Sequence, residues 1–232
     1  MTKGKMRMSK PFDLICMGMA LVDSIIKGFN PEPISASGYL AASGSLNVGG
    51  EAVNEAIAAA KLGLKTGIVC ASGDDEAGDM VRSALRRNGV SIVHAAKGAG
   101  TPVTTLFIHD EARYYTGKAD ADAMAETLLA WGVRHVIIKL GAKGCLLKTP
   151  KKTIRLPGYA VSAVDTTGAG DNFAAGFASE ILRGGTEEEA LLFANACGAV
   201  CTMAVGAGTA LKSREQVLQF MKETALESQA GQ

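Results

Sequence analysis

The chain has 232 residues, with 24 Lys and Arg against 23 Asp and Glu, and 47% of its residues are hydrophobic. That length fits one domain, or one domain with a small appendage, and the composition excludes a disordered, collagen-like or coiled-coil chain. A net charge of +1 gives no global field for holding nucleic acid or an anionic membrane, so neither partner is expected.

The cysteines and the apolar runs indicate a cytoplasmic protein. No apolar run reaches the roughly 18 residues of a membrane span. The stretch 14–22 follows basic residues, but it contains Gly18 and lacks a small-x-small cleavage site, which favours a buried strand over a signal peptide. The five cysteines are widely spaced among apolar neighbours, and this pattern is typical of reduced thiols.

Strands and helices alternate along the first half of the chain. In chain order we expect strands at 12–18, 66–71, 90–95 and 102–109, and helices at 51–62 and from Asp74 or Asp75 to about residue 88. The segment 31–50 is rich in Gly, Ser and Pro and alternates only weakly, so it is predicted to be a loop or a small, partly exposed sheet.

The second half continues the alternation. A helix capped by Asp120 leads to a strand at 133–140, which turns at 141–144 into a strand at 145–148; a strand at 161–164 and a helix at 170–182 follow. Capping boxes at Thr186–Glu189 and Ser213–Gln216 open two more helices, the first running to about residue 203. The order predicts an α/β fold with a mostly parallel sheet.

The segment 165–173, DTTGAGDNF, carries the clearest chemistry. Small residues at a helix start leave backbone N–H groups uncovered, and with the helix dipole they form an anion site. Glycines alone fit an ordinary strand-to-helix turn equally well. Asp171 favours the functional interpretation, because a carboxylate repels a bound phosphate yet can take the proton from an attacking hydroxyl.

Two competing glycine motifs fail. A dinucleotide-binding fingerprint requires a third glycine where Phe173 stands, which leaves a nucleotide-dependent oxidoreductase as a distant alternative. The Gly-Lys pairs at 4–5 and 117–118 are not followed by Ser or Thr, so the chain has no Walker A loop.

The segment from Asp165 to Asp171, with Phe173 and Gly176, resembles the signature of the ribokinase-like (PfkB) carbohydrate kinases. Further matches occur in order at 49–54 (GGEAVN), 73–78 (GDDEAG), 88–90 (NGV) and 140–144 (LGAKG). The resemblance covers nearly the whole chain in pieces. It implies a single ribokinase-like domain over 1–232, a three-layer α/β/α fold, with a small β lid formed by about 31–46 and 101–115.

The resemblance also implies roles for individual residues. The catalytic base is then Asp171, the anion hole Gly168, Ala169 and Gly170, the sugar-binding group Asp23, Gly50 and Asn54, and the nucleotide-binding group Gly141, Gly144 and Asn195. Asp165 and Thr167, with backbone near Gly206, match the monovalent-cation (K⁺) site of some members. Taken alone, Asp23 equally fits a strand end and Asn195 a core amide, and Glu51 faces either the sugar or solvent.

The activity that the resemblance implies is ATP- and Mg²⁺-dependent phosphorylation of a primary hydroxyl of a small sugar. A nucleoside is an alternative substrate, and the sugar cannot be read from these residues. The lid resembles one that pairs edge to edge in some relatives, which implies a homodimer.

One departure concerns the centre of the chain. Tyr115 of the lid runs directly into Thr116-Gly117, where the family carries an N-x-x-E motif and several β-α units, and N-x-x-E occurs nowhere here. That absence motivates an alternative function, a degenerate member that binds sugar or nucleotide without turnover. Loss of central strands predicts an opened sheet. Either Tyr115 and Thr116 are bridged by further chain, with a Cα separation well beyond the roughly 3.8 Å of a trans peptide, or the sheet is short and completed by a partner.

Overall fold

The computed structural model describes residues 11–27, 43–96, 100–101, 103–104 and 117–230. The elements of the first half are β1 (Leu14–Gly18), β2 (Leu21–Lys27), β3 (Ser43–Gly49), α1 (Glu51–Lys61), β4 (Thr66–Ala71), α2 (Glu76–Arg87), β5 (Ser91–Ala96) and β6 (Val103–Thr104). Those of the second half are α4 (Ala121–Ala130), β7 (Val136–Lys139), η1 (Gly141–Lys143), β8 (Cys145–Lys148), β9 (Thr153–Leu156), α5 (Ala169–Leu182), α6 (Glu187–Thr202) and α7 (Arg214–Ala230).

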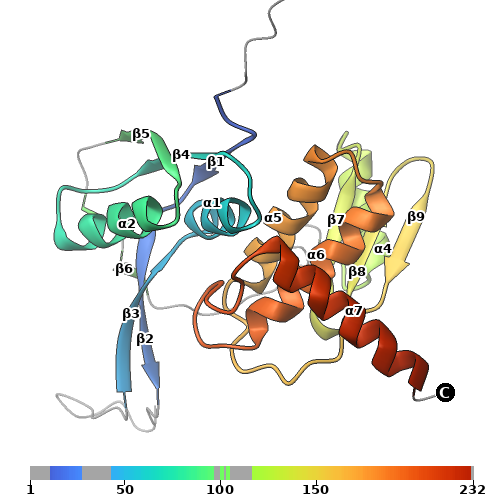
Figure 1. Cartoon of the computed structure of the whole chain (residues 1–232). Helices are drawn as coiled ribbons and strands as arrows, with labels where there is room; N and C mark the ends of the chain where they lie inside the picture. The colour runs from blue at the N-terminus through green and yellow to red at the C-terminus, as the bar shows by residue number, and fades with distance from the viewer. Residues whose placement is uncertain (1–10, 28–42, 97–99, 102, 105–116, 231–232) are drawn as a thin grey trace, which may run out of the picture.

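The described strands form separate sheets (Figure 1). The order β1-β4-β5 is parallel throughout, as predicted, and it carries the apolar core beneath α1 and α2. A second sheet has the order β3-β2-β6, with β2 and β3 antiparallel. The third, β7-β8-β9, is an antiparallel meander. The α/β class is confirmed, with its parallel part confined to the first sheet.

The first and third sheets share no strand pairing among the described residues, so β1 and β7 are both edge strands. The expectation that loss of central strands opens the sheet stays a prediction. The junction itself, Tyr115–Thr116, lies outside the described residues, as do most of 31–46 and 101–115. The described parts of the predicted lid, β6 and the first residues of β3, do belong to one small sheet with β2.

Helices join the two halves of the molecule. One apolar core combines α1, α5, α6 and the start of α7, and its buried members are Ala58, Ala59, Leu62, Ala175, Phe193, Ala196, Cys197, Val200, Leu211 and Val217. Figure 1 shows α1 and α5 between the sheets. Many of these side chains are small, which lets the helix backbones approach closely. Close packing of this kind fixes the position of one half of the molecule relative to the other.

The helix starts follow the capping residues in the sequence. Asp75 Oδ1 accepts from Gly78 N at 2.7 Å and Asp120 Oδ2 from Ala123 N at 3.0 Å. Thr186 and Glu189 form the predicted capping box at the start of α6. At α7 only half of the predicted box is present: Ser213 Oγ accepts from Gln216 N, while the Gln216 side chain turns to Lys212 N instead.

Two strand predictions need correction, and two strands were missed. The strand predicted at 161–164 is wrong, because this segment is irregular and Val164 N donates to Thr202 O at the end of α6. The strand expected at 133–140 begins only at Val136. Strands β2 and β9 were not expected.

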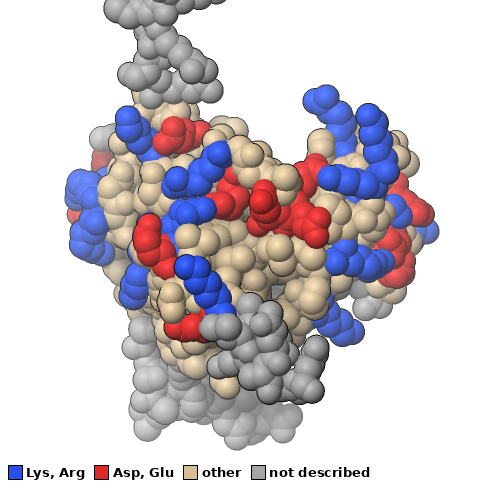
Figure 2. All heavy atoms as spheres, turned by 45° about the vertical axis from the view of Figure 1, so that its right-hand side comes forward, with Lys and Arg blue, Asp and Glu red and all other residues tan. Residues whose placement is uncertain are grey.

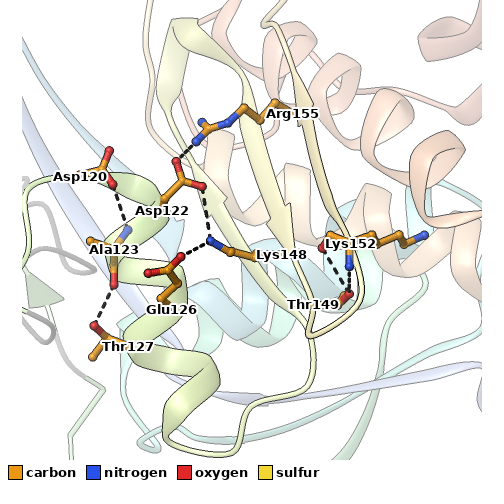
Figure 3. A network of polar contacts seen from close by, with 9 residues as sticks. All are labelled: Asp120, Asp122, Ala123, Glu126, Thr127, Lys148, Thr149, Lys152 and Arg155. Atoms are coloured by element: carbon orange, nitrogen blue, oxygen red, sulfur yellow. Dashed lines mark hydrogen bonds and ion pairs between the residues drawn. The ribbon is translucent and has the colours of Figure 1, made fainter.

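Helix α4 is tied to β8 and β9 by ion pairs on the surface (Figure 3). Lys148 Nζ lies 2.7 Å from Glu126 Oε1 and 3.6 Å from Asp122 Oδ1, and Arg155 also pairs with Asp122. Exposed pairs contribute at most about 1 kcal/mol each. The buried contacts of Met124 and Ala125 with the sheet therefore supply most of the attachment.

The thiols and the surface agree with the composition. All five cysteines are free and buried. No helix in the described part of the chain is long and apolar enough to cross a membrane. Figure 2 shows Lys and Arg interspersed with Asp and Glu over the visible face, with neither sign dominating.

We predict that Gly176→Ala destabilises the protein. A β-carbon at Gly176 falls 2.8 Å from Cys197 Sγ and 3.2 Å from Ala194 Cα, where α5 crosses α6. Overpacking of this kind costs about 1–3 kcal/mol, which urea unfolding measures directly. The control is Gly100→Ala, whose β-carbon makes an ordinary 3.5 Å contact with Asp75. Equal stability of the two variants would contradict the close α5–α6 crossing.

Candidate functional site

The start of α5 has the form predicted for an anion site. Gly168 is the N-cap, with φ of 75°, and a β-carbon there falls 2.6 Å from the Ala207 β-carbon, so only glycine fits. Ala169 N donates to Thr166 O at 3.1 Å. The N–H groups of Gly170 and Asp171, in the first turn of the helix, have no acceptor within the helix itself. The predicted anion hole therefore lies at a helix N-terminus.

Asp171 meets a residue from the opposite half of the chain. Its Oδ2 accepts from Asn54 Nδ2 at 2.8 Å, across 117 positions of sequence. Asn54 lies one turn into α1, where its N–H donates to Gly50 O at 3.0 Å. The structure thus joins the N-terminal glycine motif to the C-terminal signature through a side-chain hydrogen bond.

Asp23 and Gly50 lie near each other at the corner between β3 and α1. Asp23 is only 5% exposed, and it stands opposite Asn47 in the β2–β3 register. Its carboxylate occupies the space that a side chain on Gly49 would need. Gly50 has φ of 95° and caps α1. The predicted sugar-binding group is therefore spread over the strand corner and the first turn of the helix.

Asp165 fixes the loop that precedes α5. Its Oδ1 accepts from Thr167 N at 2.9 Å and its Oδ2 from Gly206 N at 2.8 Å. The three residues predicted for a monovalent cation are consequently adjacent, and Asp165 already has backbone donors on both oxygens. The carboxylate links the loop before α5 to the loop after α6.

A cleft of about 480 Å³ adjoins the start of α5. Its lining includes Gly141, Gly144 and Asn195, the predicted nucleotide-binding residues, together with Ala169 and Gly170 of the predicted anion hole. Asn195 is 8% exposed and donates to Pro157 O at 3.2 Å, so it also serves as a satisfied core amide. Nucleotide-binding and anion-binding candidates thus share one cavity.

Sequence reasoning overlooked two charged residues at this place. Lys139, at the end of β7, lines the same cleft, and Glu55 follows Asn54 on α1. Burial raises the pKa of Glu55, the carboxylates of Asp171 and Glu51 raise it further, and Lys139 opposes them. The sequence offered one signal for both residues. Glu55 directly follows the motif at 49–54, and Lys139 directly precedes the motif at 140–144. Glu51 itself accepts from Met19 N at 3.1 Å, at the turn after β1.

A family model for pfkB family carbohydrate kinases matches residues 13–117 and 109–214. The chain belongs to this family. The two matched segments meet at 109–117, the place where the sequence predicts that family units are missing. The match includes both motifs that the Asn54–Asp171 hydrogen bond joins.

Curated relatives match parts of the chain. A probable fructokinase-5 of Arabidopsis thaliana is 42% identical over 121 residues, 49% of this chain and 37% of that protein. A ribokinase of Haemophilus influenzae is 33% identical over 117 residues, 48% of this chain and 38% of that protein. The matched stretches thus span less than two fifths of these relatives.

Solved structures share the fold. A ribokinase from Thermotoga maritima superposes with a TM-score of 0.80 at 20% identity, covering 90% of this chain and 99% of that one. The Arabidopsis thaliana ribokinase complexed with ribose and ATP gives 0.77 at 21% identity, covering 90% and 98%. The fold is therefore ribokinase-like, as the sequence predicted.

We predict that Glu55→Gln changes how stability depends on pH. Because the pKa of Glu55 is raised above 4.5 in the folded protein, the folded state binds this proton more readily than the unfolded state. The free energy of unfolding of the parent therefore falls as the pH rises from the unfolded-state pKa of Glu55 to its folded-state pKa. Glu55→Gln does not show this fall, because it has no carboxyl group at this position.

The measurement is urea unfolding across this pH interval. The free energy of unfolding of Glu55→Gln should gain on that of the parent as the pH rises. The exposed Glu223 on α7 provides a matched control, Glu223→Gln. A constant difference between Glu55→Gln and the parent at every pH would contradict the assigned environment of Glu55.

Proposed function

We propose that this protein transfers the γ-phosphate of ATP to a hydroxyl of a small sugar, preferably a primary one. The observation that carries the proposal is Asp171, placed in the first turn of α5 and oriented by Asn54 at 2.8 Å. The cleft of about 480 Å³ beside it has space for a nucleotide. Family membership supports this class of reaction.

In the proposed reaction Asp171 takes the proton of the acceptor hydroxyl, which then attacks the γ-phosphorus in line with the bond to the β-phosphate. Asn54 donates to Oδ2 of this carboxylate at 2.8 Å and so orients it. The backbone N–H groups at the start of α5 offset charge on the transferred phosphoryl group. A general base of this kind contributes about 10²- to 10⁴-fold to the rate.

The substrate class rests on the relatives. Their names include fructokinase, ribokinase and ATP-dependent ribose-1-phosphate kinase, and one solved neighbour is an aminoimidazole riboside kinase complexed with aminoimidazole riboside. We propose that Asp23, Gly50 and Asn54 bind the acceptor. Phosphorylation assays over a panel of ketoses, aldoses and nucleosides would identify it.

Magnesium and potassium enter the proposal differently. No cluster of three or more His, Cys, Asp or Glu suited to a metal occurs among the described residues. Mg²⁺ commonly needs only one or two protein carboxylates plus substrate phosphates, so the site fits Mg²⁺ carried by ATP. For K⁺ we propose the loop around Asp165 and Thr167; a solved fructokinase from Vibrio cholerae has fructose, ADP and potassium bound.

A second candidate function is binding of sugar or nucleotide without turnover. The missing N-x-x-E motif and the separation of β1 from β7 favour it, because both remove parts of the fold between the two halves of the site. Measured ATP consumption in the presence of the sugar panel discriminates between the two functions.

We also propose a cytoplasmic location, from the free buried cysteines, and a homodimer through the small sheet. Among the described strands β3 stands at an edge of that sheet, which leaves backbone groups for pairing with a second copy. Light scattering of the purified chain tests the dimer.

Asp171→Asn should lower kcat by about 10²- to 10⁴-fold. The amide keeps the shape and still accepts from Asn54, so sugar and ATP affinities should change little. Steady-state kinetics with calorimetry separates the two effects, and Asp79→Asn on the exposed face of α2 serves as the control. Near-parental kcat in Asp171→Asn would remove this residue from the mechanism.

Asp23→Ala should weaken sugar binding while leaving nucleotide binding unchanged. Loss of the carboxylate leaves sugar hydroxyls without partners, at a cost of about 1–3 kcal/mol. Calorimetry with the sugar identified in the panel gives the affinity, and thermal unfolding verifies the fold. Parental sugar affinity in a folded variant would reject the assignment.

A further inference from the structure

Lys61, the last residue of α1, is hydrogen-bonded to the turn that follows α6 (206–208, the post-α6 turn). Its Nζ donates to Gly208 O at 2.9 Å, across 147 positions of sequence. Helix α1 therefore contacts the second half of the molecule at both of its ends, because Asn54, one turn into the helix, donates to Asp171. Burial lowers the pKa of Lys61. Placing an ammonium there costs free energy that an exposed lysine does not incur.

The post-α6 turn is held by hydrogen bonds from several elements. Gly206 and Gly208 are both buried, so their backbone polar groups need partners inside the protein. Gly206 N donates to Asp165 Oδ2 at 2.8 Å, and Gly208 N donates to Cys201 Sγ at 3.3 Å. Lys61 donates to the Gly208 carbonyl. Removing its ammonium would therefore leave a buried carbonyl without that hydrogen bond and detach the turn from α1.

The same turn packs beneath the start of α5. A β-carbon on Gly168, the N-cap of α5, would fall 2.6 Å from the Ala207 β-carbon. A β-carbon on Gly208 would fall 3.2 Å from both Nδ2 and Oδ1 of Asn172. Asn172 is buried and donates to Gly168 O at 2.8 Å. Because these groups are in close contact, a displacement of the turn displaces Gly168, the first residue of the predicted anion hole.

From this geometry we infer that Lys61 is a positioning residue, which holds Gly208 and thereby fixes the post-α6 turn against the start of α5. The inference rests on the proposed function, since the helix start that it positions belongs to that reaction. Lys61 lies at the opposite end of α1 from Gly50 and Asn54 and is not among the described residues that line the cleft. It therefore acts through the turn and not on a ligand.

The experiment compares the parental chain with Lys61→Met, Lys61→Arg and Lys65→Met. Lys65 is exposed in the loop between α1 and β4, so its variant makes the same change in net charge a few residues away. Steady-state kinetics with ATP and the acceptor identified in the panel gives kcat. Calorimetry at fixed ionic strength measures the binding of inorganic tripolyphosphate and, separately, of the acceptor. Thermal unfolding verifies that each variant is folded.

We expect Lys61→Met to lower kcat by roughly 10- to 100-fold, on the scale of the loss caused by misplacing a catalytic group by about 1 Å. Tripolyphosphate binding should weaken as well, whereas acceptor binding should stay parental because Asp23 and Gly50 are remote from the post-α6 turn. Lys61→Arg keeps a charged donor and should restore most of both losses, and Lys65→Met should match the parent. A merely structural role of Lys61 would weaken acceptor and tripolyphosphate binding together.

A second variant, Lys61→Gln, serves where Lys61→Met does not fold. Its side chain is polar but shorter than that of lysine, so it removes the bond to Gly208 O without placing an apolar group at this position. The expected losses are the same as for Lys61→Met.

Two results overturn the inference: a folded Lys61→Met or Lys61→Gln variant with parental kcat and tripolyphosphate binding, and losses that extend equally to acceptor binding. The parental chain tests the proposed function separately. Lys61-dependent tripolyphosphate binding by a chain that phosphorylates no sugar would sustain the inference and reject the reaction. Phosphorylation that is unchanged in Lys61→Met would do the reverse, and a parental chain that neither phosphorylates a sugar nor binds tripolyphosphate would reject both.

Discussion

The packing of α1 against α5 and α6 is the constraint on which the site depends. The sheets on either side share no strand pairing in the described part of the chain, so this helical core fixes one half relative to the other. It includes small side chains such as Ala58, Ala175 and Cys197. Asn54 lies on α1 and Asp171 on α5. A change in the spacing of these two helices would therefore change how Asn54 orients the carboxylate of Asp171.

The contact between α1 and α5 also brings several carboxylates close together. The carboxylates of Asp171 on α5 and of Glu51 on α1 both raise the pKa of Glu55 on α1. Carboxylates placed together beside an anion site weaken it, whereas Lys139 at the end of β7 carries the opposing charge. Opposed charges at close range make the site sensitive to substitutions that leave the fold intact.

Local signals determined most of what could be predicted. The helix start at 168–171 follows from small residues and their order, and Asp75, Asp120 and Thr186 cap their helices through contacts three residues away. The Asn54–Asp171 hydrogen bond spans 117 positions, so the motifs alone do not specify it.

The errors have equally local causes. The segment 161–164 has the apolar residues of a strand, yet its backbone pairs with the end of α6, which no periodicity reveals. Lys139 was overlooked because its significance depends on Gly170, a residue on another element.

The open edge of β1 carries a consequence for the behaviour of the protein in solution. Ile15 and Met17 are 51% and 80% exposed, on a strand whose outer side has no hydrogen-bonded neighbour among the described strands. Unpaired strand edges with apolar side chains template intermolecular sheet growth. We therefore expect association through this edge to limit the concentration at which the protein stays in solution.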